Sequence, residues 1–474
     1  MKRPWLAAGL CLVVVGLGTI GVRHESRAEL QRALASLRAN LPPDARFEYD
    51  HAYPRFFARG AGFDNARFIR GETVLTARVL TISNPQGYLS TGLSVSRIHA
   101  QGVEIRGEVA GKIDDLTIGK LLLPPVTREK HDVTGLPPAS QLHFRHGQIH
   151  GVALTSASGC TLTIHEASLD NYGHDDGNAG SLHDGHLLCA KESAVADTLA
   201  SAFHQPAAPL GIDVTDLRES GIRYARYVGW AEQFTGGTLP DHAALLSDTL
   251  ETPARTETKG LALSFLNMRL TTDTSEMHRW QEGKKSIETR SETRHSILTI
   301  DLPVLLALSL PPVTHIDTVT QTISFDTASR VGTIAFNATT PNSFVFEGHI
   351  VVNNLENFDG EHLPALVATD LTYHDEGGNL DALLTRIAAQ RNQSLGDLKQ
   401  VIVPSMTLLA LKVPGLSALP EFISAPTGRT LTLSFHPPIP LDNQSLIGLV
   451  QPLRKDPAMA QAWSSPPILS TTLH

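Results

Sequence analysis

Between residues 46 and 125 the pattern of apolar and polar positions has a period of two. Phe47 and Tyr49 alternate with Arg46 and Glu48, which places the two aromatic side chains on one face of a strand. Further β-rich runs follow, separated at short intervals by glycine, asparagine and proline, at residues 74–82, 93–98, 103–106 and 116–118. Many short strands at near-regular spacing predict antiparallel β-structure.

The same pattern resumes after a polar linker at residues 126–136, which lies between two Pro-Pro pairs. Residues 141–220 and 313–355 are again rich in β-forming runs. Elsewhere apolar residues recur at helical spacing, and this predicts helices at 222–234, 242–250, 380–390, 394–412 and 445–453. Ser394 with Asp397 is a start signal for the fourth of these helices.

These patterns predict a mainly β fold with α-helical additions (α+β), in which an N-terminal transmembrane helix precedes repeated short antiparallel strands. The expected organisation has five segments. They are an anchor at 1–23, a membrane-proximal helix and linker at 24–43, a β-rich region at 44–220, a mixed region at 221–370 and a helical/β region at 371–474.

The anchor is predicted from a basic tail followed by an apolar segment. Lys2 and Arg3 precede an uncharged stretch that runs from Trp5 through Leu12 to Val22. A helix of this length spans roughly 27 Å at about 1.5 Å per residue, close to the thickness of a bilayer core. We expect an uncleaved signal anchor, because the stretch is long and no clean small-x-small site ends it. A cleaved signal peptide is the alternative.

The orientation of this anchor rests on two opposed signals. Four arginines follow the apolar stretch: Arg23, Arg27, Arg32 and Arg38. By the positive-inside rule, they favour a cytosolic location for this flank and for the large domain that follows it. A charged short tail ahead of a first apolar helix is instead typical of an export signal, and long domains cross membranes largely regardless of charge. We expect the bulk of the chain outside the cytosol.

Composition and charge narrow the class of partner. Hydrophobic residues make up 41% of the chain and charged residues 18%, as in a folded protein with a sizeable core. Without Lys2 and Arg3, the 39 basic residues become 37 against 48 acidic ones, a net charge of −11. This balance argues against a nucleic-acid partner and against a polybasic membrane-binding patch.

The chain has three cysteines, and two of them form a candidate pair. Cys11 lies in the apolar stretch, where it is expected to act as a small packing residue. Cys160 and Cys189 remain as an even pair in the part expected to be exported. We expect them to form a disulfide, because export would place them in an oxidising compartment; two unpaired buried thiols are the alternative.

Seven of the 21 histidines fall between residues 143 and 186, interspersed with aspartates. Imidazole and carboxylate together can hold zinc, copper or nickel, and His174, Asp176, His183 and His186 are the candidate metal ligands. Solvated histidines on a glycine-rich loop are the alternative interpretation. The common nucleophile, zinc-helix and phosphate-loop motifs are missing, so the sequence names no catalytic residue and no cofactor.

Two segments carry a family resemblance. Residues 47–66 (FEYDHAYPRFFARGAGFDNA) lead into 71–77 (GETVLTA), and residues 371–381 (LTYHDEGGNLD) precede helices near the end. This arrangement resembles AsmA-like and related envelope proteins of proteobacteria. The resemblance implies a single-pass inner-membrane protein with a periplasmic β-structure whose groove handles lipid or assists outer-membrane assembly. It brings no catalytic residues with it.

Three functions are therefore open. The first is a non-enzymatic envelope protein that binds lipid or an envelope partner, in which the strands would line an apolar concave face. The second is an anchored hydrolase or metal-binding enzyme centred on residues 143–186. The third is a scaffold of a membrane complex.

Overall fold

The structure is a computed structural model. It describes Gln31, Leu34 and residues 45–55, 59–88, 92–124, 138–174, 177–203, 207–235, 254–265, 268–282, 286–300, 313–326, 328–354, 365–441 and 468–474. The chain divides into two compact units. Unit 1 comprises residues 1–240 and 256–266, and unit 2 comprises residues 241–255 and 267–474.

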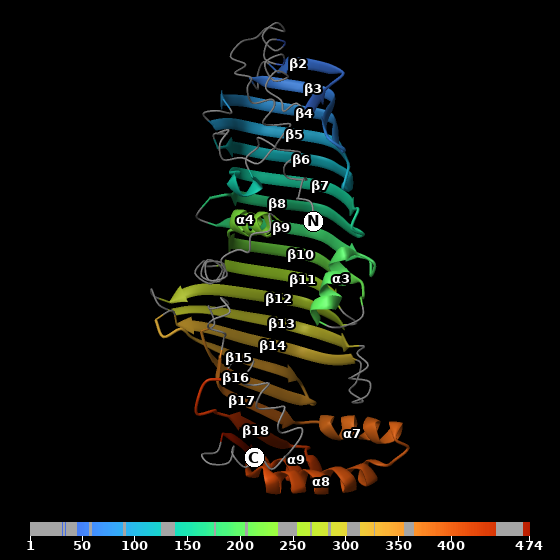
Figure 1. Ribbon diagram of the computed structural model, residues 1–474, viewed down its shortest axis with the longest axis vertical. Helices are drawn as coiled ribbons and strands as arrows, with labels where there is room; N and C mark the ends of the chain where they lie inside the picture. Colours follow the sequence, from blue (N-terminus) through green and yellow to red (C-terminus); the bar gives the residue numbers. More distant parts are fainter. Residues whose placement is uncertain are drawn as a thin grey trace. The chain divides into compact units, whose positions relative to one another are not determined.

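Unit 1 contains one antiparallel sheet whose strands follow each other in chain order (Figure 1). Two short strands, β1 (Ala45–Glu48) and β2 (His51–Arg55), both pair with β3. The long strands are β3 (Gly60–Arg70), β4 (Thr73–Tyr88), β5 (Gly92–Arg106), β6 (Val109–Leu123), β7 (Phe144–Ser156), β8 (Cys160–Tyr172), β9 (Asn178–Cys189), β10 (Leu210–Ile222) and β11 (Ala254–Phe265).

Two lines of left-handed residues cross this sheet. The first kink line has positive φ in every second strand, at Asn65, Gly102, Gly151, Asp184 and Gly260. The second has positive φ in the intervening strands, at Asn84, Lys120 and Asn171. At both lines the cross-strand pairing skips one residue on each strand, for example Arg78 with Gly102 and Ser96 with Lys120. Glycine and asparagine recur here because they adopt the left-handed region at little cost.

The kinks keep apolar side chains on one face of very long strands. In an unkinked strand, side chains on one face recur at every second residue. In β5 the steps between consecutive buried apolar residues alternate between two and three positions. These residues are Leu93, Val95, Ile98, Ala100, Val103 and Ile105. Each step of three coincides with a kink line, where two consecutive side chains turn away from the core. We call the apolar side of the sheet the inner face.

The strands are longer than the predicted ones, and the kinks explain why. Asn84, Gly102 and Gly111 were expected to end short strands, because asparagine and glycine are common in turns. They lie instead inside β4, β5 and β6. The runs at 93–98 and 103–106 are thus parts of one strand. The prediction of a mainly β, antiparallel protein is confirmed, and the prediction of short strands is wrong.

A short helical layer packs against the middle of the unit 1 sheet. It consists of a 3-10 turn, η1 (Ala139–Gln141), and α4 (Tyr224–Thr235), close to the helix expected at 222–234. Tyr224 and Ala139 contact the hydrophobic core of the sheet. The Tyr172 hydroxyl donates to the Ala139 carbonyl (3.0 Å), and the Tyr224 N–H donates to the buried Asn178 side chain (2.8 Å).

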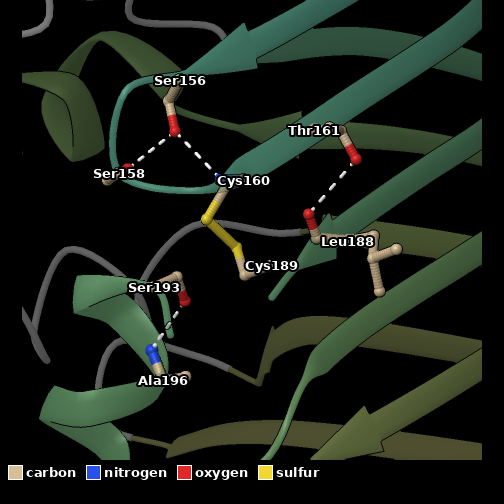
Figure 2. Close-up of a disulfide and its surroundings, with 8 residues drawn as sticks. All are labelled: Ser156, Ser158, Cys160, Thr161, Leu188, Cys189, Ser193 and Ala196. Carbon is tan, nitrogen blue, oxygen red and sulfur yellow. Dashed lines mark hydrogen bonds between the residues drawn. A yellow bond between two sulfur atoms is a disulfide. The ribbon is translucent and has the colours of Figure 1, made fainter. Parts of the chain in front are cut away.

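Cys160 and Cys189 form a disulfide that joins β8 to β9 (Figure 2). The two residues lie directly opposite each other at the ends of the two strands. Helix α3 (Ala194–Phe203) follows, and the Ser193 hydroxyl caps its first turn by accepting the Ala196 N–H. The pair expected from the sequence is therefore joined in the structure.

Unit 2 contains a second run of antiparallel strands, again in chain order (Figure 1). These strands are β12 (Met268–Glu282), β13 (Ser286–Ile300), β14 (Val313–Asp326), β15 (Val331–Thr340), β16 (Phe344–Asn353), β17 (Ala365–Asp375), β18 (Arg429–Phe435) and β19 (Leu469–Leu473). One kink crosses β12–β14, where the left-handed His295 is near Asp273 and Asp317.

Helices lie between β17 and β18, as the helical spacing predicts. They are α7 (Asn379–Gln390), α8 (Leu395–Lys412), the 3-10 turn η2 (Pro414–Leu416) and α9 (Leu419–Ser424). Ser394 and Asp397 form the expected capping box at the start of α8. The fully buried Asp375 accepts the N–H groups of Asn379 and Leu380 (2.7 and 2.8 Å), which fixes the start of α7.

Several predicted elements lie outside the described residues. They are the anchor with Trp5, Leu12 and Val22, nearly all of the membrane-proximal helix and linker at 24–43, and the helices at 242–250 and 445–453. Leu34 is described and is buried in the unit 1 core. Over the described ranges, no helix has both the length and the apolar character needed to cross a membrane.

Candidate functional site

The inner face of unit 1 carries unbroken rows of apolar residues across β5–β10. Residues directly opposite each other on neighbouring strands point to the same face of a sheet. One row consists of Val103, Ile113, Val152, Ile164, Gly185 and Val214, and the next of Ala100, Leu116, Ile149, Ala167, Leu182 and Leu217. Their backbone polar groups are used in strand pairing, so the face offers hydrocarbon and little else.

The inner face is deeply buried over β3–β6 and only half-buried over β8–β10. The inner-face residues of β3–β6 are almost completely inaccessible; Phe63, Val95 and Ile98 are all 0% exposed. The equivalent residues of β8–β10 are only half-buried: Leu162, Ile164, Leu169, Leu182, Leu187, Ile212, Val214 and Leu217. The apolar face therefore continues beyond the part that is packed over, and its side chains there are partly exposed.

A single carboxyl group interrupts the apolar rows of β3–β10 in the described residues. Glu219 continues the row formed by Ile98, Ile118, Gly147, Leu169 and Gly180. Burial raises the pKa of the Glu219 carboxyl. Glu219 therefore places a carboxyl group at a position where the neighbouring strands carry apolar residues.

Unit 2 has its own half-buried apolar face. One row across β15–β19 consists of Ala338, Phe346, Tyr373, Leu431 and Leu473. Phe336 packs against Phe346 with ring centroids 5.4 Å apart, and Tyr373 meets the buried Phe422 of α9 edge-on at 6.0 Å. Helix α9 thus contacts one part of this face, while Phe336 and Phe346 remain half-exposed.

The opposite face of unit 2 has a polar groove of about 330 Å³. Its side chains include Asn337, Glu347, His349 and Asp370, with threonines around them. Asn337 donates to Glu347 (2.6 Å). Burial alone would raise the pKa of Asp370, but hydrogen bonds from Ser434 and His436 outweigh it and hold that pKa below its ordinary value. The groove is acidic and already hydrogen-bonded internally.

Most of the histidine-rich segment belongs to β7, β8 and β9 and is not a loop. Four of its seven histidines face carboxylates on the outer side of the unit 1 sheet: His146, His150, His183 and His186. Residues opposite each other across β6–β10 alternate between acid and histidine, in the order Asp115, His150, Glu166, His183 and Asp216. We call this row the acid–histidine ladder. Cross-strand pairs of opposite charge stabilise a sheet, which accounts for the pattern without a ligand.

The candidate metal ligands are not brought together by the described residues. His183 Nδ1 lies 2.9 Å from Asp216 and His186 Nδ1 lies 2.8 Å from Asp213, so each histidine has its own carboxylate on β10. His174 contacts His143 instead. Asp176 lies outside the described residues. In the part of the chain that the structure describes, no three histidine, cysteine or acidic side chains are grouped so as to hold a metal ion.

The His183–Asp216 pair of the acid–histidine ladder should make the thermal stability of the protein depend on pH. The hydrogen bond with Asp216, assisted by the charge of Asp184 3.4 Å away, raises the pKa of His183 above its ordinary value near 6.5. A raised pKa in the folded state gives stability that is complete below pH 6.5 and is lost as pH rises through the folded-state pKa. We expect the melting temperature of the wild-type protein to fall over this range more than that of His183→Gln, as measured by thermal unfolding between pH 5.5 and 8.5.

Asp216→Asn provides the matched variant, because it removes the carboxylate and leaves the histidine. It should flatten the same part of the pH profile as His183→Gln does. Identical profiles for the wild type and both variants would show that this pair does not contribute.

The sequence contains a signal for the inner face that simple alternation does not reveal. The kinked strands repeat an apolar-x-apolar-x-x-apolar-x-apolar pattern, for example Ile98-His-Ala100-Gln-Gly-Val103-Glu-Ile105. A period of two detects only half of such a strand at a time. A search for paired steps of two and three would have joined the halves. It would also have marked Glu219, which occupies the last apolar position of the pattern in β10 after Ile212, Val214 and Leu217.

Comparison of the chain with protein-family models, with curated proteins and with solved structures finds no match to any of them.

Proposed function

We propose that this protein is a non-enzymatic binding protein for aliphatic chains, such as the acyl chains of lipids, which lie against the inner face of the sheet. The observation that carries the proposal is the set of half-buried aliphatic residues on β8–β10, which continues the closed core of β3–β6. Aliphatic side chains on a hydrogen-bonded sheet favour hydrocarbon and give a polar ligand nothing to bind.

Two further features support an envelope setting for this function. The apolar stretch from Trp5 to Val22 would tether the protein to the inner membrane, with the bulk of the chain in the periplasm. The disulfide between Cys160 and Cys189 suits such an oxidising compartment.

The test compares two leucines on the same strand. Leu182 belongs to an inner-face row of β9, whereas Leu188 of β9 is 55% exposed and lies outside those rows. We expect Leu182→Asn to weaken the binding of a fluorescent anthroyl-labelled fatty acid about tenfold, equivalent to about 1.4 kcal/mol, because it places an amide in the hydrocarbon contact. Leu188→Asn should leave the affinity unchanged. Binding is measured by fluorescence titration with the full chain.

Equal effects of the two substitutions, or a wild-type protein that does not bind the labelled fatty acid, would contradict the proposal. Thermal unfolding of both variants checks that a loss of binding is not a loss of fold.

A scaffold role is the second candidate, and one observation favours it. Helix α8 exposes a stripe of apolar side chains at heptad-like spacing: Val401 is 60% exposed, Leu408 63% and Leu411 73%. Such spacing suits a facing helix of a protein partner.

The scaffold hypothesis predicts that a specific partner is lost when this stripe is made polar. We expect a cross-linked partner recovered with the wild type to disappear from Leu408→Ser/Leu411→Ser and to persist with Gln400→Ala, a polar control on the same helix. Recovery of the same partner with both variants would rule out α8 as the contact.

A further inference from the structure

We infer that Glu219 binds the polar end of the aliphatic ligand, and that it selects a hydrogen-bond-donating group, a hydroxyl or an ammonium, over an anionic one. This inference rests on the proposed binding of aliphatic chains by the inner face. The inference specifies the polar end group of the ligand and identifies Glu219 as the residue that recognises it.

The first support is the position of Glu219 in the pattern of β10. The strand repeats the apolar pattern of its neighbours, with Ile212, Val214 and Leu217 on the inner face, and the next inner position is Glu219. A charged residue at a position that packing reserves for hydrocarbon costs stability. Natural sequences break such local rules mainly where a functional site requires it.

The second support is the space left around the carboxyl group. Gly180 of β9 lies directly opposite Glu219, and a Cβ built on Gly180 would lie 3.4 Å from Glu219 Oε1. The glutamate side chain therefore extends over the bare backbone of β9. Beyond Gly180, the next residue of the row is Leu169 of β8. The carboxyl thus lies beside the half-buried apolar rows of β8–β10, where it can meet the polar end of a chain that lies on them.

The third support is that Glu219 has no hydrogen-bond or ion-pair partner among the described residues. Several other carboxylates of this sheet are paired on its outer face, as Asp216 is with His183 and Asp213 with His186. A half-buried carboxyl without a protein partner keeps its acceptor oxygens free for a donor on a ligand. A hydroxyl or ammonium group supplies a donor, whereas a carboxylate or phosphate would add a second negative charge beside it.

The experiment compares three probes that share a ten-carbon chain: decanol, decylammonium and decanoate. We expect the wild-type full chain to bind decanol and decylammonium about tenfold more tightly than decanoate, measured by isothermal titration. Glu219→Leu, which restores the apolar pattern, should bind all three with affinities within about twofold of each other. Glu219→Gln should keep the preference for decanol, because the amide oxygen still accepts a hydrogen bond, and lose the additional attraction of the ammonium group.

Asp213→Asn, on the outer face of the same strand, is the matched control and should leave the wild-type preference intact. Both Glu219 variants should unfold at the wild-type temperature or above it, since each removes a half-buried ionisable group that has no protein partner among the described residues. If Glu219→Leu does not fold, the binding of decylammonium by Glu219→Gln still tests whether the charge of Glu219 attracts the ammonium group.

The outcomes distinguish a failure of the proposed aliphatic-chain binding from a failure of the role assigned to Glu219. A wild-type protein that binds none of the three probes contradicts the proposed function, and the inference falls with it. A wild-type protein that binds all three equally, or a Glu219→Leu variant that keeps the wild-type ratio, overturns the inference and leaves aliphatic binding by the inner face intact.

Discussion

Phe63→Ala should destabilise unit 1 by about 3–5 kcal/mol, which is the usual cost of removing a fully buried phenylalanine ring. Phe63 is 0% exposed on the inner face of β3. Its ring meets Phe47 at 5.5 Å edge-on and Tyr49 at 5.6 Å, so three aromatic rings lose a common contact. Because β1, β2 and β3 form the closed end of the inner face, the cavity cannot be filled by simple side-chain rearrangement.

Amide hydrogen exchange measured by mass spectrometry is suited to this prediction, because it reports the two units separately. The amides of β3–β5 should exchange faster in Phe63→Ala, while those of α7 and α8 keep their wild-type rates. Arg67→Ala is the control on the same strand, since Arg67 points outward and its ion pair with Glu48 is long, at 3.9 Å. Equal protection of β3–β5 in Phe63→Ala and Arg67→Ala would contradict the assignment of Phe63 to the core.

Removing the disulfide with Cys160→Ala/Cys189→Ala should cost about 3–4 kcal/mol of unit 1 stability. The cysteines are separated by 29 positions, and closing a loop of that length restricts the unfolded chain by this amount in the chain-entropy treatment. The loss should be concentrated in β8, β9 and the start of α3, where Ser193 caps the helix four residues after Cys189.

The double variant should match the wild-type protein under a strong reductant, since both lack the same cross-link. Denaturant unfolding with and without reductant measures this. Two outcomes would contradict the prediction: a double variant as stable as the oxidised wild type, or a reductant effect that persists in the double variant.

Several parts of the fold could be predicted from the sequence because their signals are local. The spacing of apolar residues predicts α7 and α8, and Ser394 with Asp397 marks the start of α8 because a capping box involves only neighbouring residues. The two cysteines outside the N-terminal stretch could pair only with each other. Alternating runs predict a β protein because the period of two survives between kinks.

Other parts depend on contacts between distant residues. Asn84 and Gly102 are read as turn residues from the local sequence, but the strands continue through them because left-handed residues in alternate strands line up across the sheet. The histidines of residues 143–186 suggest a metal site, but their partners Asp213 and Asp216 come from β10, about 30 positions further along the chain. No local pattern shows which strand will lie beside β9.

The inner face can be predicted from the sequence in outline only. An apolar face follows from alternation, but its open end depends on how far packing extends over it. Leu182 and Leu93 have the same chemistry in the sequence, and only the structure shows that Leu93 is 1% exposed while Leu182 is half-buried.

Photo-cross-linking shows whether aliphatic chains bind to the inner face of the sheet. A fatty acid with a diazirine in its chain is bound to the full protein and irradiated, and the labelled residues are identified by mass spectrometry. We expect adducts on Leu162, Leu182 and Leu217, which occupy the half-buried inner-face rows of β8, β9 and β10. Adducts confined to exposed apolar residues elsewhere, such as Leu188 or Leu411, would contradict it.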